Sequence, residues 1–143
     1  GKVPARGPAN DIKGIAPSPG WDDRYEWTSW IPAAETPRAD HAGIEAKGWH
    51  ATANQRIHPA DYPHFMGQDW VTPERQDRIE ALLAATTKHS AATLRDIQAD
   101  TLSLATAKLL PVLRATTTTH PLHGAVQEHL KSFDANMRAD GVA

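Results

Sequence analysis

The sequence predicts an α+β chain in which a proline-rich extended segment with one short strand precedes a mainly helical half. Three observations support this class. Most of the 11 prolines lie in the first half of the chain, apolar residues recur at helical spacing only after residue 72, and a single short aromatic run is typical of a strand. We expect residues 1–71 and 72–143 to form two parts of one larger domain.

The first 37 residues are expected to be extended and turning. Prolines recur too often there for a long helix or a central strand. The apolar side chains of this segment are mainly aromatic, namely Trp21, Tyr25, Trp27 and Trp30. Such rings are expected to hold a coil against another surface. A coil of this kind needs a partner surface.

Residues 48–54 form the best strand candidate, because the run is short and includes aromatic and β-compatible side chains. Asn54, Gln55 and Arg56 then stand where the strand passes into a loop. This loop is expected to run over residues 57–71, with Pro59 and Pro63 keeping it open and aperiodic.

Four helices are predicted in the second half. Thr72 is expected to cap the first, with Pro73 at its first helical position, and Ser90 is expected to cap the second. A third stretch covers residues 101–113, where Pro111 either kinks the helix or marks its last turn. After a threonine-rich linker, residues 121–137 place apolar side chains on one stripe and predict a final helix.

Composition excludes several classes of function. A net charge of −2, from 15 basic and 17 acidic residues, gives no electrostatic case for binding nucleic acid. No window approaches the roughly 20 apolar residues of a membrane span. The absence of cysteine excludes disulfides, thiolate catalysis and cysteine-based zinc sites within this chain.

The eight histidines do not predict a metal site. His120, His123 and His129 are the nearest cluster, but their spacing does not place the rings on one helical face, as zinc pairs require. Asp61 and Asp69 could join a carboxylate site, yet solvated loop carboxylates are the favoured interpretation.

The order of motifs around residues 48–83 resembles the interior of the β subunit in the penicillin acylase (penicillin amidase) family of N-terminal-nucleophile hydrolases. The matching residues are Ala53-Asn54-Gln55-Arg56, Asp61-Tyr62-Pro63, Asp69-Trp70, Glu74-Arg75 and Arg78-Ile79. Upstream, Pro19-Gly20-Trp21 and Tyr25-Glu26-Trp27 extend the match, as do Gln98, Asp100 and Ser103 downstream. The resemblance covers the chain from about Gly1 to Asp140. It implies that this chain is a fragment of an αββα sandwich.

The resemblance also implies roles for two residues. Asn54 corresponds to the amide that donates a hydrogen bond to the oxyanion formed when an acyl amide is attacked. Arg75 corresponds to an arginine close to the nucleophile that gives electrostatic support. From the residues alone, Asn54 could equally be an ordinary turn residue, and Arg75 an arginine that reaches to solvent or to a nearby carboxylate.

The remaining expectations also come from the resemblance. The nucleophile lies outside the chain, since Gly1 has no side chain to attack with, so the fragment alone should be inactive. No cofactor is needed for catalysis, although some members hold a structural calcium whose ligands lie mostly elsewhere. The expected partners are the α subunit, the rest of the β subunit and a small acyl-amide substrate, without nucleic acid or membrane, in an exported, periplasmic or secreted parent.

A noncatalytic helical interaction module is the alternative function. In that interpretation the aromatic residues between Trp21 and Trp30 form a docking surface.

Overall fold

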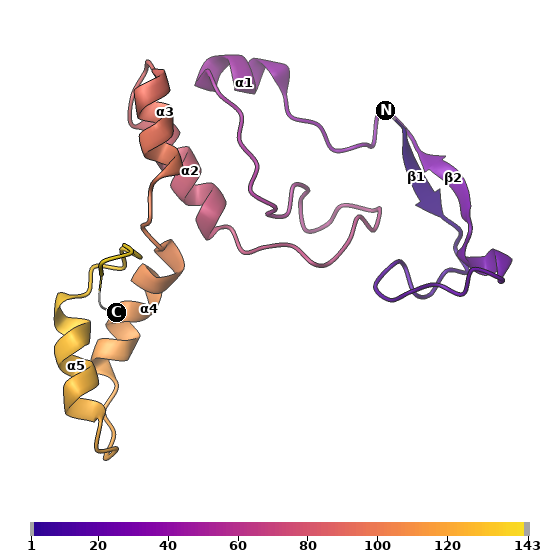
Figure 1. Ribbon diagram of the computed structural model, residues 1–143. Helices are drawn as coiled ribbons and strands as arrows, with labels where there is room; N and C mark the ends of the chain where they lie inside the picture. Colours follow the sequence, from indigo (N-terminus) through magenta and orange to yellow (C-terminus); the bar gives the residue numbers. More distant parts are fainter. Residues whose placement is uncertain (1, 142–143) are drawn as a thin grey trace. The chain divides into compact units, whose positions relative to one another are not determined.

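A computed structural model describes residues 2–141, and the described chain contains five α-helices and one small sheet (Figure 1). The elements are β1 (Val3–Arg6), the 3-10 helix η1 (Asp23–Tyr25), β2 (Trp27–Ile31), α1 (His41–Lys47), α2 (Glu74–Ala84), α3 (Ala91–Gln98), α4 (Leu104–Ala115) and α5 (His123–Ser132). The predicted α+β class with mainly helical content is confirmed. Gly1 lies outside the described residues.

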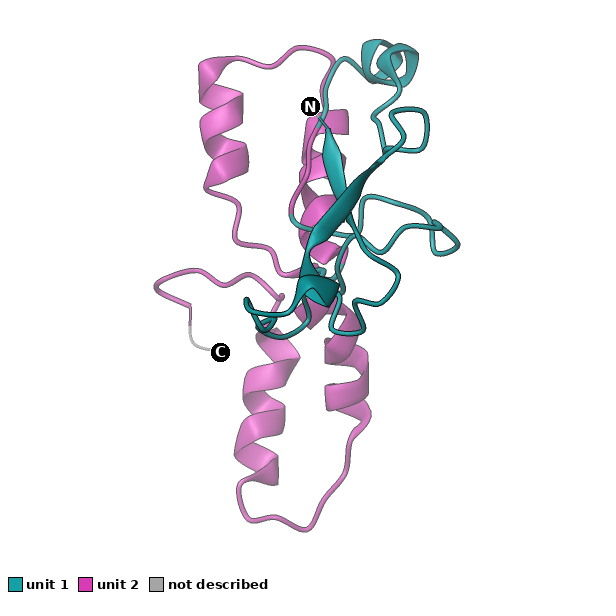
Figure 2. Cartoon of the chain, turned by 90° about the vertical axis from the view of Figure 1, so that its right-hand side faces the viewer, with its two compact units in different colours: residues 1–50, 54–72 teal, residues 51–53, 73–143 magenta. Residues whose placement is uncertain are grey.

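Two compact units divide the chain (Figure 2). The first comprises residues 1–50 and 54–72, and the second comprises residues 51–53 and 73–143. A short piece of chain that precedes Asn54 therefore packs with the helical unit, while Asn54 itself belongs to the first unit.

The sheet of the first unit is an antiparallel pair, β1 with β2, in a register that runs from Val3 opposite Ile31 to Arg6 opposite Trp27. The aromatic and β-branched residues of β2 suit a pleated strand. Pro4 is tolerated because a two-stranded sheet has only edge strands. This pairing corrects the expectation that the proline-rich start is coil throughout.

The strand predicted over residues 48–54 is wrong. Instead, α1 precedes this stretch: the Asp40 side chain accepts a hydrogen bond from the Gly43 backbone N–H at 3.0 Å, and Gly48 ends the helix with a left-handed φ of 77°. Residues 49–53 form no ladder with another described segment, since the nearby pairing is a single parallel bridge between Gln55 and Val71. Aromatic composition alone does not make a strand without a neighbouring strand.

Helix starts in the second unit follow local capping signals. Ser90 forms a capping box with Thr93 at the start of α3, and the Ser103 side chain caps α4. Pro111 lies inside α4, which continues to Ala115. The start of α2 was predicted one residue early: Pro73 occupies the cap position, where its carbonyl accepts from the Asp77 backbone N–H at 2.8 Å.

A small core and two backbone hydrogen bonds between distant segments hold the second unit together. α2 packs against α3 and α4, and α4 packs against α5. The stretch leading into α4 pairs with the stretch after α5, since the Ser103 N–H donates to the Ala135 carbonyl and the Met137 N–H donates to the Thr101 carbonyl, both at 2.9 Å. Leu110 and Ala135 are buried there. Within residues 2–141, no helix has the length and apolar character needed to cross a bilayer.

An ion pair joins α2 to the end of α3. Arg78 donates from Nε to Asp100 Oδ2 at 2.9 Å and from Nη2 to Oδ1 at 2.6 Å, and the two side chains are 28% and 19% exposed. The hydrogen bonds from Arg78 hold the pKa of Asp100 below its usual value, and those to Asp100 raise the pKa of Arg78. Bidentate geometry with partial burial makes this pair stronger than an ordinary surface pair.

We expect this pair to make stability depend on pH. The folded-state pKa of Asp100 is lowered, so its contribution is present above the unfolded value of about 3.9 and is lost as pH falls through the folded value. Arg78→Lys keeps the charge but loses the fork, and should reduce the free energy of unfolding at pH 7 by about 1 kcal/mol. In denaturant unfolding measured at a series of acidic pH values, the free energy of unfolding of this variant should also fall less steeply with decreasing pH.

The matched control is Arg95→Lys, because the pair of Arg95 with Asp96 is 77% and 69% exposed. Exposed pairs of this kind contribute little to stability. Equal losses in the two variants would contradict a structural role for the Arg78 pair.

Candidate functional site

Asn54 has a fixed backbone and an exposed side chain. Its φ is 65°, in the left-handed region that asparagine adopts more readily than most residues. Its carbonyl accepts a hydrogen bond from the Val71 backbone N–H at 3.0 Å, beside the bridge between Gln55 and Val71. Among the described residues, none forms a hydrogen bond with the Asn54 side chain. The amide group is therefore available on a backbone that two segments of the chain hold in place.

Arg75 is the second residue of α2, and its side chain is exposed. Its exposure leaves the guanidinium solvated, so no desolvation has to be offset. Ile79, Leu82 and Leu83 are only half-buried, and Arg75 forms no ion pair within the part of the chain that is described. It remains a cation at the positive end of a helix, free to meet a group from outside.

Gln76 is the residue of α2 that is buried, with 6% exposure, and sequence reasoning missed it. Its Nε2 donates to the Ala51 carbonyl at 2.9 Å and to Glu80 Oε1 at 2.7 Å. Nothing in the local pattern marks this position, because a glutamine in the first turn of a helix is usually solvated.

Asn54 belongs to the first unit and Arg75 to the second. The structure therefore describes the surroundings of each residue separately.

Side-chain contacts hold the loop after Asn54, which its prolines had predicted to be open and aperiodic. The His58 ring lies 4.9 Å from the Tyr62 ring and 5.6 Å from the Trp70 ring, centroid to centroid. Tyr62 donates from its hydroxyl to the Glu35 carbonyl at 2.8 Å, and His64 Nε2 lies 2.5 Å from a Glu35 carboxylate oxygen. These contacts tie the loop to the segment that follows β2.

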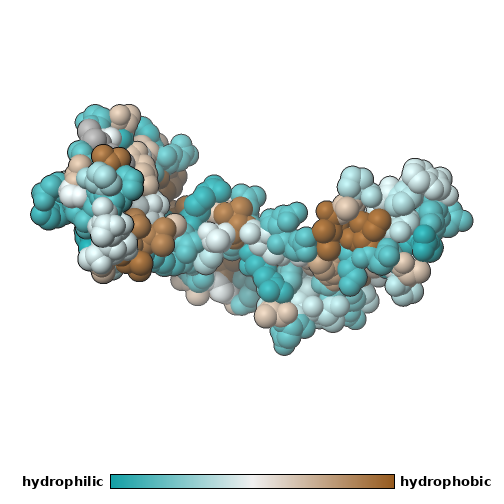
Figure 3. All heavy atoms as spheres, turned by 90° about the horizontal axis from the view of Figure 1, so that it is seen from below, coloured by the Kyte–Doolittle hydropathy of each residue, from teal (hydrophilic) through white to brown (hydrophobic). Residues whose placement is uncertain are grey.

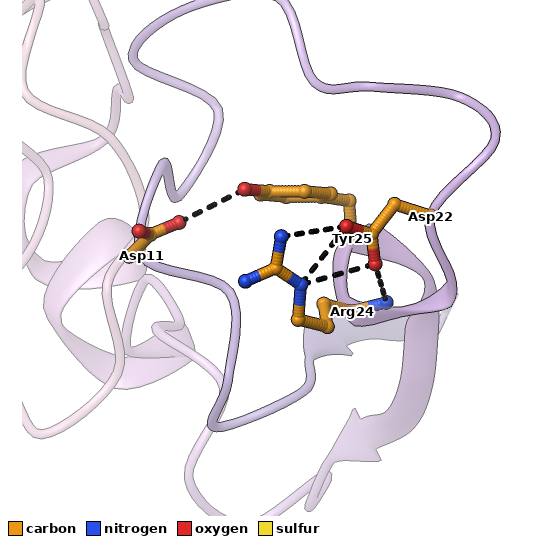
Figure 4. Close-up of polar contacts among 4 residues, drawn as sticks. All are labelled: Asp11, Asp22, Arg24 and Tyr25. Carbon is orange, nitrogen blue, oxygen red and sulfur yellow. Dashed lines mark hydrogen bonds and ion pairs between the residues drawn. The ribbon is translucent and has the colours of Figure 1, made fainter.

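A second polar cluster closes the long connection between β1 and β2 (Figure 4). Arg24 forms a bidentate pair with Asp22, since Nε donates to Oδ1 at 3.1 Å and Nη2 donates to Oδ2 at 2.6 Å, and this hydrogen bonding lowers the pKa of Asp22. Tyr25 donates to Asp11 Oδ1 at 3.2 Å. Desolvation, followed by the charge of Asp11, raises the pKa of Tyr25. Its hydroxyl therefore stays a neutral donor. The hydrogen bond from Tyr25 to Asp11 joins the two ends of this connection.

No group of three or more histidine, aspartate or glutamate side chains within residues 2–141 is arranged to hold a metal ion. Asp61 and Asp69 are both exposed in the loop.

The comparisons with known proteins agree with one another. The family model for penicillin amidase matches residues 1–143. An acyl-homoserine lactone acylase QuiP of Pseudomonas fluorescens Pf0-1 is 33% identical over 126 residues, which is 88% of this chain and 15% of that protein. The penicillin acylase 2 proenzyme of Pseudomonas sp. SE83 is 37% identical over 103 residues, which is 71% of this chain and 12% of that protein. The chain thus spans about 15% of the length of these curated relatives.

Proposed function

Because this chain belongs to the penicillin amidase family, we propose that it supplies part of the active site of a larger acyl-amide hydrolase. The resemblance predicted from its motifs is confirmed, and the relatives named above are acylases. Since the chain spans about 15% of their length, the nucleophile and most of the acyl pocket are assigned to the rest of the protein.

The backbone of Asn54 is the observation that carries this proposal. When an N-terminal nucleophile attacks an amide carbonyl, the oxygen gains negative charge and needs donors already in position. Asn54 offers two side-chain N–H donors, is neutral at every working pH, and makes no competing hydrogen bond with the described residues. Its carbonyl is held by Val71, so little reorganisation is required when the charge develops.

Arg75 is proposed to give electrostatic support. Its guanidinium is always charged and carries five donors in a planar fork, and its exposure leaves it free to meet a polar substrate group or the developing oxyanion. An unpaired cation in the first turn of a helix brings no favourable dipole interaction. Stability therefore does not explain this residue, whereas attraction of negative charge does.

The substrate class proposed is a linear acyl amide, with N-acyl homoserine lactones and β-lactam side-chain amides as the two candidates that the relatives' names suggest. The test is amine release by the purified whole protein from both kinds of substrate, each supplied with acyl groups of increasing length. The isolated 143-residue chain should release none. Turnover by that chain, or an inactive whole protein, would contradict the proposal, and the second result would favour the noncatalytic module.

The partner proposed is the remainder of the same protein, because both units leave apolar side chains at the surface (Figure 3). On the α4–α5 hairpin, the apolar surface is formed by Leu109, Val112, Leu113, Leu122 and Val126, of which Val112 is 64% exposed and Leu122 62%. So many exposed apolar side chains on one hairpin are expected to be covered by another protein surface. The aromatic residues predicted to pin the first segment to another surface, Trp21, Trp27 and Trp30, are exposed as well.

Cysteine labelling tests this partner, since the chain has no cysteine of its own. Val112→Cys and Leu122→Cys in the folded whole protein should react with a maleimide at least tenfold more slowly than Glu128→Cys. Glu128 is a suitable control on α5, with a side chain that is 71% exposed. Equal labelling at all three positions would show that the rest of the protein does not cover the hairpin.

A further inference from the structure

We propose that Trp70 is a positioning residue for Asn54, acting through the backbone N–H of Val71. The inference rests on the oxyanion role proposed for Asn54. All the residues that carry it belong to the first unit, and most lie in the loop that leaves Asn54 and returns beside it.

The loop closes on Asn54 through its backbone. The Val71 N–H donates to the Asn54 carbonyl at 3.0 Å, and Val71 forms a parallel bridge with Gln55. Asn54 has a φ of 65°, which a non-glycine residue keeps only where its surroundings determine it. The direction in which Asn54 presents its amide therefore depends on where Val71 is held.

The Trp70 side chain, directly before Val71 in the chain, is fixed by two contacts. Its indole N–H donates to the Gly67 carbonyl at 3.2 Å. Its ring meets the His58 ring edge to face, with centroids 5.6 Å apart and planes at 77°, an arrangement that aromatic rings favour. Because His58 lies on the outgoing part of the loop, this contact joins the returning segment to the segment that leaves Asn54.

The His58 ring is itself supported from outside the loop. It lies 4.9 Å from the Tyr62 ring, centroid to centroid, and the Tyr62 hydroxyl donates to the Glu35 carbonyl at 2.8 Å. The series of contacts from Glu35 to Trp70 therefore lies within the first unit. It ends at the residue next to the one that holds Asn54.

A hydrophobic core does not fix this loop. No residue from 54 to 72, a stretch that the structure describes completely, is buried. A segment with few buried apolar contacts opens easily, so its conformation depends on individual side-chain contacts. Those of Trp70 are the ones adjacent in sequence to Val71, and their loss should let the Val71 N–H move relative to the Asn54 carbonyl.

A double-mutant cycle on the whole protein tests the proposal. Trp70→Leu keeps an apolar side chain and removes both the ring and the indole N–H. Because small displacements of a catalytic group reduce rates steeply, kcat should fall about tenfold while KM stays within about twofold. In the Asn54→Ala background, the same substitution should change kcat by less than about twofold, because the group it positions is gone.

Phe65→Leu is the matched control. Phe65 lies in the same loop and is 41% exposed, but its ring lies 5.9 Å from Lys13 Nζ and makes no ring contact with His58 among the described residues. This variant should keep kcat within about twofold. If Trp70→Leu does not fold, His58→Leu serves in the same cycle, since it removes the ring against which Trp70 packs.

The same tenfold loss in both backgrounds would show a merely structural role and overturn the proposal, as would unchanged kcat in Trp70→Leu. A raised KM with unchanged kcat would make Trp70 a substrate contact and would overturn it as well. If Asn54→Ala by itself leaves kcat unchanged, the proposed function fails first and this inference falls with it.

Discussion

Replacing Asn54 with alanine in the whole protein is expected to lower kcat about 10²- to 10³-fold, the usual loss when one oxyanion donor is removed. KM should change little, because the donor meets its full charge only in the transition state. The exposed side chain makes no hydrogen bond with the described residues, so the one stability cost expected is the strain of alanine at the left-handed φ of this position. Steady-state amine release and thermal unfolding measure the two effects.

Asn54→Gly is the matched variant. Alanine at a φ of 65° is strained, whereas glycine adopts this region freely. Both variants lack the amide, so both should lose the same factor in kcat, while only the alanine variant should show a lower melting temperature. A glycine variant with normal kcat would attribute the alanine loss to the backbone and remove the amide from the mechanism.

Arg75→Ala is expected to reduce kcat/KM about 10- to 100-fold, as for the loss of a hydrogen bond from a charged group. Stability should stay the same or rise slightly, because the substitution removes an exposed cation from the positive end of α2. Opposite signs for activity and stability are typical of a residue retained for function.

Arg75→Lys separates charge from geometry. Lysine keeps the charge without the planar fork, so the variant should have an intermediate kcat/KM. Wild-type activity in Arg75→Ala, with or without a change in melting temperature, would show that this arginine is a solvent-exposed residue with no role in catalysis.

Local signals predicted the four helices of the second half, whereas α1 was missed. Pairing over long distances was not predictable. Ser90 and Ser103 begin helices because each side chain accepts a bond from the third backbone amide after it, a pattern contained within four residues. The pairing of β1 with β2 joins residues more than 20 positions apart. No single segment reveals such a partner, and the strand was therefore expected in the aromatic run before Asn54 instead.

The site shows the same division. A left-handed asparagine at a turn is a local feature, but the strand expected to end at Asn54 does not form, so Asn54 lies within an irregular stretch and not at a strand end. The burial of Gln76 depends on Ala51, 25 residues away, and nothing in the local pattern indicates it. The nucleophile is proposed to lie outside this chain, so no pattern within the chain could have located it.

The most direct test of the central claim is the affinity of the whole protein for a phosphonate analogue of the tetrahedral intermediate, with and without Asn54. A tetrahedral anion engages the oxyanion donor in a way that the ground-state amide does not. Binding to Asn54→Ala should be about 10²-fold weaker than to the unchanged protein, while the KM for substrate stays within about threefold. Equal affinity for the analogue in the two proteins would contradict the assignment of Asn54 as the oxyanion donor.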